Sequence, residues 1–257
     1  MSFCVYIPAR HASTRLPGKP LLDIAGKPLI RHVWERALES GAESVVIATD
    51  DERIRACAAA FGATVCMTSS EHGSGTDRLA EAVASMGEPP ERIVVNLQGD
   101  EPSMPGRWIA RVAALLAADA HCHMATLSVP ITDAHELLDP NVAKVVVGAR
   151  GEALYFSRAP IPFRRDAAAL PVQGGPFLRH VGVYAYRAGF LRHFSQLPSC
   201  AIEQLECLEQ LRALYHGHRI QVAIAEGPVE KGVDTEIDLA AARAYFARPP
   251  ARSGAYS

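Results

Sequence analysis

Short runs of apolar and β-branched residues alternate with helix-like segments through the first half of this chain of 257 residues. The alternation predicts strands and helices in the order strand 3–7, helix 28–40, strand 45–49, helix 51–61 and strand 63–67. Gly41 and Gly62 follow the two helices, at the position where a left-handed cap residue is favoured. This order is typical of an α/β fold with a doubly wound sheet, in which ligands bind at the carboxyl ends of the strands.

The same pattern continues to residue 130 and then changes. Further elements are predicted at helix 76–86, strand 92–97, helix 105–118 and strand 124–129. After Pro130, strand-like segments at 142–147, 153–156 and 180–186 surround a stretch rich in Pro, Gly and Arg at 160–176. Helix 202–215, strand 219–225 and helix 236–246 follow. We therefore expect one domain over 1–247, with a small inserted lobe at about 131–190 that carries a mobile loop, and a C-terminal tail at 248–257.

A basic loop, IPARHASTRLPGKP, follows the first predicted strand and carries Arg10, Arg15 and Lys19 without an acidic residue. Small residues within it allow backbone amides to come close to a ligand; they are Ala9, Ala12, Ser13 and Gly18. Two guanidinium groups and one ammonium suit a polyanion such as a nucleoside triphosphate. Alternatively, the loop could be a solvated basic segment that pairs with surface carboxylates.

The positive charge of this loop is local, because the formal net charge of the whole chain is −2. A balance of this kind argues against a general nucleic-acid or membrane-surface binder. No apolar run approaches the ~20 residues that cross a bilayer, and the N-terminal segment has no signal-peptide pattern. We expect a cytoplasmic protein that binds neither nucleic acid nor membrane.

Two aspartates stand where a metal ligand would be useful. Asp100 follows a predicted strand in the run NLQGDEP, and Asp234 follows Gly232-Val233 just before the last predicted helix. Carboxylates from distant segments beside a triphosphate-binding loop are what Mg²⁺-dependent phosphoryl or nucleotidyl transfer requires. Asp238 has a structural role as part of a capping box with Thr235, and Asp234 could alternatively serve only as a charge at a helix N-terminus.

The run HGSGTDR at 72–78 opens a predicted helix and could hold the base or the phosphates of a nucleotide. It is not a dinucleotide fingerprint, because Arg78 replaces the third glycine. The chain also has no GxxxxGK[ST] sequence and no GxSxG elbow. Nicotinamide dehydrogenases, P-loop enzymes and serine hydrolases are therefore disfavoured.

Seven motifs together resemble one enzyme family. In chain order they are IPARHASTRLPGKPL, HGSGTDR, NLQGDEP, LYFSRAPIP, FLRHVGVYAYR, LECLEQLR and GVDT. From about Phe3 to about Tyr245 the chain resembles the 3-deoxy-manno-octulosonate cytidylyltransferases, or CMP-Kdo synthetases. The resemblance implies a nucleotide-diphospho-sugar transferase-like fold, usually as a homodimer, that makes CMP-Kdo and pyrophosphate from CTP and Kdo for lipopolysaccharide biosynthesis.

The resemblance also implies roles for individual residues. The catalytic set would be Arg10, Arg15, Lys19, Asp100 and Asp234, with the two aspartates binding Mg²⁺. CTP would be bound by Pro8, Ala9, Arg10, Ser13, Arg15, Lys19, Ser74, Arg78 and Asp100. The sugar would be bound by Gln98, Arg158, Arg165, His180, Tyr184, Glu209 and Gln210.

Several alternatives stay open at this stage. Arg164 stands beside Arg165, so either could contact the sugar, and 166–176 shows no motif of the family. His180 and Tyr184 could be core residues, and Glu209 and Gln210 could lie on a solvated helix face. A CMP-sialic acid synthetase would share the basic loop and the metal logic, although RHVGVYAYR and LEQLR favour Kdo. A non-catalytic nucleotide-sugar binding protein would require a broken site, whereas both aspartates and all three cations are present.

Overall fold

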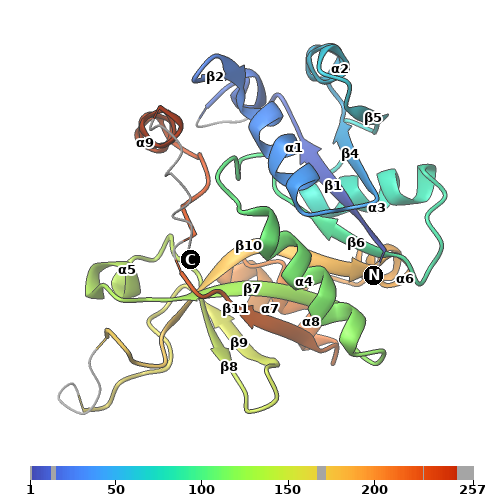
Figure 1. The fold of residues 1–257 in the computed structure, drawn as a ribbon. Coiled ribbons are helices and arrows are strands. Elements are labelled where there is room, and N and C mark those ends of the chain that lie inside the picture. The colour runs from blue at the N-terminus through green and yellow to red at the C-terminus, as the bar shows by residue number, and fades with distance from the viewer. Residues whose placement is uncertain (1, 13–15, 167–171, 228, 248–257) are drawn as a thin grey trace, which may run out of the picture.

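The computed structural model describes residues 2–12, 16–166, 172–227 and 229–247. Within these residues the chain forms a nine-stranded mixed sheet whose central path runs β11-β7-β10-β6-β1-β4-β5 (Figure 1). The strands of this path are β1 (Phe3–Ala9), β4 (Ser44–Thr49), β5 (Thr64–Met67), β6 (Ile93–Asn96), β7 (Met124–Pro130), β10 (Leu178–Arg187) and β11 (Ile220–Ile224). Only β10 is antiparallel to its neighbours in the path, β6 and β7.

Helices contribute to a hydrophobic core on each face of the sheet. One face is covered by α1 (Leu29–Glu39), α2 (Glu52–Ala60), α4 (Gly106–Ala118) and α9 (Glu236–Phe246). The other face is covered by α3 (Gly75–Ser85), α6 (Ala188–Phe194) and α8 (Gln210–Tyr215). The short elements are a 3-10 helix η1 (Lys19–Leu21), the hairpin of β2 (Asp23–Ile24) and β3 (Lys27–Pro28), α5 (Ala134–Leu138) and α7 (Ala201–Glu206).

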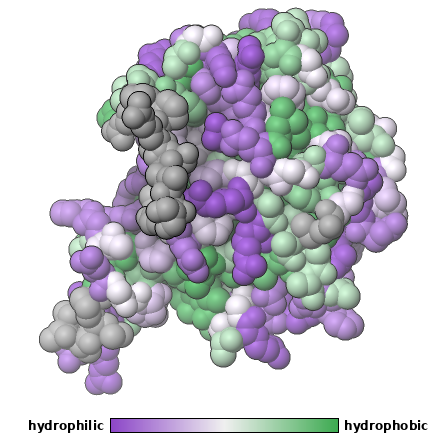
Figure 2. All heavy atoms as spheres, in the orientation of Figure 1, coloured by the Kyte–Doolittle hydropathy of each residue, from purple (hydrophilic) through white to green (hydrophobic). Residues whose placement is uncertain are grey.

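Strand β1 shows why the sheet needs helices on both sides. Val5 and Ile7 point into one core, whereas Cys4 and Tyr6 point into the other. All four side chains are buried, because a strand in the middle of a doubly wound sheet has no solvent face. The predicted α/β fold with a doubly wound mixed sheet is therefore confirmed. Hydrophilic and hydrophobic side chains are interspersed over the outer surface shown in Figure 2.

The predicted helix at 202–215 is wrong. The chain forms two helices there, α7 and α8, separated by Cys207 in a left-handed conformation with φ 50°. Arg158 stabilises this interruption between the two helices, because its Nε donates a hydrogen bond of 2.7 Å to the carbonyl of Glu206. The Glu206 carboxylate in turn accepts the backbone N–H of Arg158 at 2.8 Å. A long-range contact thus overrides a continuous helical pattern.

The segment 131–190, predicted as an inserted lobe, is joined to the main sheet. Strands β8 (Lys144–Val147) and β9 (Ala153–Ser157) form an antiparallel pair that extends from β10 (Figure 1). Strand β10 itself lies in the centre of the main sheet, between β6 and β7. The same core therefore runs from the early strands into this segment.

No helix in the described part of the chain is long and apolar enough to cross a membrane.

The six cysteines are free thiols. Cys4, Cys66, Cys122 and Cys200 are buried, whereas Cys57 is half-buried and Cys207 is exposed at the break between α7 and α8.

Candidate active site

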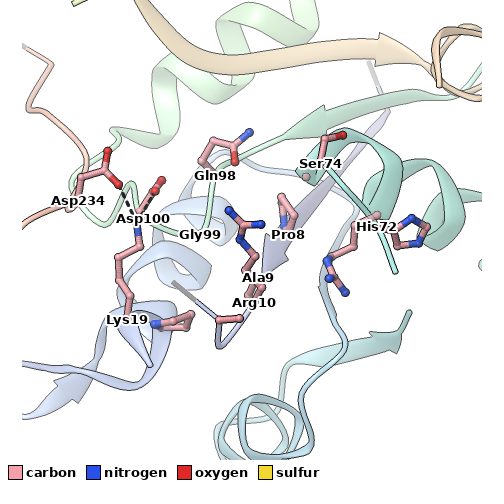
Figure 3. A pocket seen from close by; sticks show the side chains of 14 residues that line it. Pro8, Ala9, Arg10, Lys19, His72, Ser74, Gln98, Gly99, Asp100 and Asp234 are labelled. Carbon is pink, nitrogen blue, oxygen red and sulfur yellow. Dashed lines mark hydrogen bonds and ion pairs between the residues drawn. The ribbon is translucent and has the colours of Figure 1, made fainter. Parts of the chain in front are cut away.

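A cleft of about 440 Å³ opens at the edge of the sheet where β1 and β6 end. Every described residue of the predicted CTP set lies in its walls: Pro8, Ala9, Arg10, Lys19, Ser74, Arg78 and Asp100. Gln98 and Asp234 lie there too. Figure 3 shows Lys19, Asp100 and Asp234 at one end of the cleft and Ser74 and His72 at the other, with Arg10 between them. Ser13 and Arg15 lie outside the described residues.

A close backbone contact builds the floor of the cleft. A Cβ atom added to Gly99 would lie 2.7 Å from the carbonyl oxygen of Pro8, closer than real Cβ contacts allow. The turn after β6 can therefore pack directly on the end of β1 only because residue 99 has no side chain. The turn presents Gln98 and Asp100 on either side of this contact, beside Arg10.

Lys19 links the two predicted metal ligands. Its Nζ donates to Oδ2 of Asp100 at 2.7 Å and to Oδ1 of Asp234 at 3.1 Å. Burial acts to lower the pKa of Lys19, but the two carboxylates outweigh it and raise the pKa above its usual range. The ammonium is thus held charged. Asp234 directs its carboxylate into the cleft, while Asp238 caps α9 by accepting the backbone N–H of Thr235 at 2.8 Å.

Two carboxylates that converge on one ammonium present oxygens toward a common cationic position. Mg²⁺ is usually bound by one or two carboxylates and completes its shell with water and phosphate oxygens. No group of three or more His, Cys, Asp and Glu side chains that could hold a metal occurs in the described ranges. Asp100 and Asp234 therefore fit a Mg²⁺ ion that takes its remaining ligands from a nucleotide.

The N-terminus of α3 forms the opposite wall. Ser74 is the N-cap, and its Oγ accepts the backbone N–H of Asp77 at 3.1 Å. Arg78 is 3% exposed, and its guanidinium donates to Oδ2 of Asp50 at 2.8 Å and to the hydroxyl of Thr68. Arg78 therefore ties α3 to the loops that follow β4 and β5, and it borders the cleft from that fixed position.

The predicted sugar-binding residues on β10 pack beside the cleft. His180 contacts the rings of Phe156 and Tyr184, whose centroids lie 5.1 and 5.2 Å away. Burial and the neighbouring Arg179 lower the pKa of His180 to about 3, so the ring is neutral at pH 7. Its Nε2 lies 3.0 Å from Oγ1 of Thr126, and that hydroxyl donates to the carbonyl of Val183 at 2.8 Å. The imidazole proton therefore belongs on Nε2, which leaves Nδ1 as an acceptor.

Glu209 connects the predicted sugar residues to the nucleotide wall. Its carboxylate accepts the hydroxyl proton of Thr76 at 2.5 Å, which joins the start of α8 to the start of α3. Burial raises the pKa of Glu209, partly offset by the hydroxyls of Thr76 and Ser74. Gln210 is 5% exposed, and its Nε2 has no hydrogen-bond partner in the described part of the chain. A buried amide in this condition is suited to receive a polar ligand.

The two predicted arginines of the sugar set lie farther out. The guanidinium of Arg158 donates to the backbone carbonyls of Glu206 and Pro140, at 2.7 and 3.0 Å, so it braces two loops. Arg165 is exposed and Arg164 is half-buried, and both lie shortly before the undescribed residues 167–171. A sugar contact by any of these arginines stays a prediction.

Sequence reasoning missed a second cavity of about 520 Å³, which shares Asp100 and Asp234 with the cleft. Glu101, Arg179 and Lys231 line it. Burial, with the adjacent Asp100 carboxylate, raises the pKa of Glu101 to about 8. The signal in the sequence was the second acidic residue of the run GDEP, which stands directly after the predicted ligand.

Comparison with known proteins agrees with this geometry. The sequence model of a family described as cytidylyltransferase matches residues 4–220. A 3-deoxy-manno-octulosonate cytidylyltransferase from Nitrosococcus oceani is 55% identical over 244 residues, which cover 93% of this chain and 94% of that protein. A protein of the same name from Coxiella burnetii (strain Dugway 5J108-111) is 53% identical over 250 residues, or 96% of this chain and 100% of that protein.

This chain belongs to the 3-deoxy-manno-octulosonate cytidylyltransferase family. A solved structure of CMP:2-keto-3-deoxy-manno-octonic acid synthetase in complex with CTP superposes on it with a TM-score of 0.87. The two chains are 45% identical, and the match covers 96% of this chain and 99% of the other. The cytidylyltransferase fold predicted from the motifs is thus confirmed.

Proposed function

We propose that this cytidylyltransferase transfers CMP from CTP to 3-deoxy-D-manno-octulosonate and releases pyrophosphate. The observation that carries the proposal is the convergence of Arg10, Lys19, Asp100 and Asp234 in one cleft. These residues come from three distant parts of the sequence, in a chain more than half identical to the relatives above. In the proposed reaction, the anomeric hydroxyl of the sugar attacks the α-phosphorus of CTP in line with the leaving pyrophosphate.

Each end of the cleft has its own task. Arg10 and Lys19 bring positive charge to the triphosphate, and the wall at Ser74 holds the cytidine end. The sugar acid binds on the β10 side, where Gln98, His180 and Tyr184 lie. Holding the two reactants in contact removes most of the entropic cost of bringing them together.

Asp100 and Asp234 would hold Mg²⁺. The bound ion would neutralise negative charge at the α-phosphate and lower the pKa of the attacking sugar hydroxyl. Arg10 and Lys19 line the same cleft, where they would contact the phosphate oxygens and stabilise the charge that grows on the pyrophosphate. Neutral His180 offers Nδ1 as an acceptor for a sugar hydroxyl without adding charge.

We also propose that the protein is a homodimer, that it is located in the cytoplasm and that it serves lipopolysaccharide synthesis. CTP is a cytoplasmic metabolite, which supports that compartment. Large apolar side chains are exposed in the region 154–205, including Leu154 at 63%, Phe163 at 86% and Leu205 at 83%. Exposed apolar side chains of this size are suited to an interface between subunits. Light scattering coupled to size-exclusion chromatography would measure the mass of the assembly.

The decisive assay measures pyrophosphate release from CTP, with and without Mg²⁺, in the presence of Kdo or of N-acetylneuraminic acid. Release with Kdo alone supports the proposal. Release with N-acetylneuraminic acid alone would assign the chain to CMP-sialic acid synthesis. CTP binding without release in either case would point to a non-catalytic binding protein.

Substitution of one carboxylate tests the metal role. We expect Asp100→Asn to reduce turnover by roughly two to three orders of magnitude or more, because loss of one contact to developing charge costs ~3–4 kcal/mol. Glu91→Gln, at an exposed position outside the cleft, is the control. Turnover of Asp100→Asn close to that of the unsubstituted chain would rule out this role.

A further inference from the structure

Lys19 stands between the two carboxylates that would bind the metal, and this position has a consequence for the order of binding. The ammonium lies 2.7 Å from Asp100 and 3.1 Å from Asp234, and the Lys19 side chain is only 13% exposed. The three residues belong to separate segments: the start of η1, the loop after β6 and the loop before α9. Lys19 thus serves as a cationic partner of both carboxylates.

A divalent ion cannot share the pair with the ammonium in this position. Mg²⁺ binds oxygen ligands at about 2.0–2.1 Å and demands near-octahedral geometry. An ion bound to both carboxylates would therefore lie in the space that the Lys19 ammonium occupies. The two cations would also repel each other strongly at such a separation. Metal binding by Asp100 and Asp234 requires that Lys19 move.

The nucleotide supplies the alternative partner for Lys19. The lysine side chain is a flexible four-carbon stem that carries a point charge. Lys19 and Arg10 line the same cleft, so a triphosphate bound there offers oxygens to both. A nucleotide phosphate can thus draw the ammonium away from the carboxylates while it contributes further ligands to the metal. Because coupling between two ligands is reciprocal, the metal must strengthen nucleotide binding by the same factor.

We propose that the Lys19 ammonium withholds the Asp100–Asp234 pair from divalent metal until the phosphates of a bound nucleotide take it up. The inference deepens the proposed function, on which it rests. It makes the nucleotide-free protein a poor binder of divalent metal. It also prevents the paired carboxylates from repelling each other before the nucleotide binds.

The test measures Mn²⁺ binding to the nucleotide-free full-length chain, by the electron paramagnetic resonance signal of free Mn²⁺. Mn²⁺ takes the same oxygen ligands as Mg²⁺. We expect Lys19→Met to bind Mn²⁺ roughly tenfold more tightly or better than the unsubstituted chain, because one unit charge next to the ion is removed. The double variant Lys19→Met/Asp100→Asn should lose this gain.

Two further variants serve as controls. Lys27→Met removes a lysine that pairs with Glu35 at 2.8 Å outside the cleft, and it should leave the Mn²⁺ affinity unchanged. Lys19→Arg retains the charge and should retain weak binding. Circular dichroism establishes that each variant is folded, and Lys19→Gln replaces Lys19→Met if the latter is not. With either neutral variant, Mn²⁺ should raise the melting temperature more than it does for the unsubstituted chain.

Mn²⁺ binding by Lys19→Met that is equal to or weaker than that of the unsubstituted chain would overturn the inference. Weaker binding would mean that Lys19 only holds the carboxylates in place for the metal. This outcome is separate from the proposed function, which the pyrophosphate assay tests on the unsubstituted chain. Suppose that the unsubstituted chain releases pyrophosphate and that Lys19→Met binds Mn²⁺ with the same affinity as the unsubstituted chain. This result would refute the proposed exchange of Lys19 for the metal but would still support the proposed function.

Discussion

His180 should make the stability of this protein depend on pH below neutrality. Burial and the charge of Arg179 lower its pKa to about 3, whereas an exposed histidine has a pKa near 6.5. The folded protein therefore keeps the ring neutral at pH 5, while the unfolded chain takes up a proton. Because the folded-state pKa is depressed, the contribution is fully present above pH 6.5 and is lost as the pH falls toward 3.

The magnitude follows from the two pKa values. Each unit of pH below 6.5 lowers the free energy of unfolding by about 1.4 kcal/mol, as long as the His180 ring stays neutral in the folded protein. At pH 5 the loss is about 2 kcal/mol. That is a substantial part of the 5–15 kcal/mol that typically separates a folded domain from its unfolded chain.

Urea unfolding at pH 7 and at pH 5 measures this contribution. The unsubstituted chain should lose about 2 kcal/mol more between the two pH values than His180→Gln, in which residue 180 cannot take up a proton. His135→Gln, at an exposed position, should retain the pH dependence of the unsubstituted chain. Equal pH dependence in the unsubstituted chain and His180→Gln would refute the neutral, buried state of His180.

Three further substitutions test the supports of the site. Gly99→Ala should lower the melting temperature and reduce turnover at least roughly tenfold, because the new Cβ would lie 2.7 Å from the carbonyl oxygen of Pro8. Gly73→Ala, where a Cβ meets nothing within 4 Å, is its control, and equal melting temperatures would contradict the close contact. Lys144→Met should lower the free energy of unfolding by about 3 kcal/mol, because the buried ammonium donates to three backbone carbonyls. A loss below about 1 kcal/mol in a urea titration would argue against that role. Thr235→Ala should cost about 1 kcal/mol through loss of the N-cap of α9, and an unchanged urea midpoint would show that the cap is dispensable.

Local patterns predicted most of the early fold because they coincide with its tertiary structure. Gly41 and Gly62 both adopt positive φ, at 74° and 83°, after the helices that they were expected to end. Strand β1 was recognisable because a strand buried on both faces is apolar throughout. The break at Cys207 was not predictable, since a cysteine has no particular preference for a left-handed conformation and the contacts of Arg158 that favour it come from 48 or 49 residues away.

The parts of the candidate site that lie at strand ends were predictable from the sequence. The parts that depend on pairing between distant strands or side chains were less predictable. Asp100 and Lys19 meet because the loops after β6 and β1 leave the same edge of the sheet. Strand β10 begins at this edge because it pairs antiparallel with β6, and His180 therefore lies beside Asp100 and Lys19. The sequence does not encode this pairing locally. The pairing of Arg78 with Asp50 was likewise hidden, because both residue types were equally compatible with direct nucleotide contact.

The overlap of the two cavities indicates where the proposed transfer takes place. Among the described residues, the cleft with Arg10 and the second cavity with Arg179 and Lys231 share only Asp100 and Asp234. In the proposed reaction both substrates are anions, so they repel each other where they meet. A cation on the shared carboxylates would lower that repulsion at the one place common to both cavities. Because no other residue in the described ranges borders both, the reacting groups must meet at Asp100 and Asp234 if the two cavities each take one substrate.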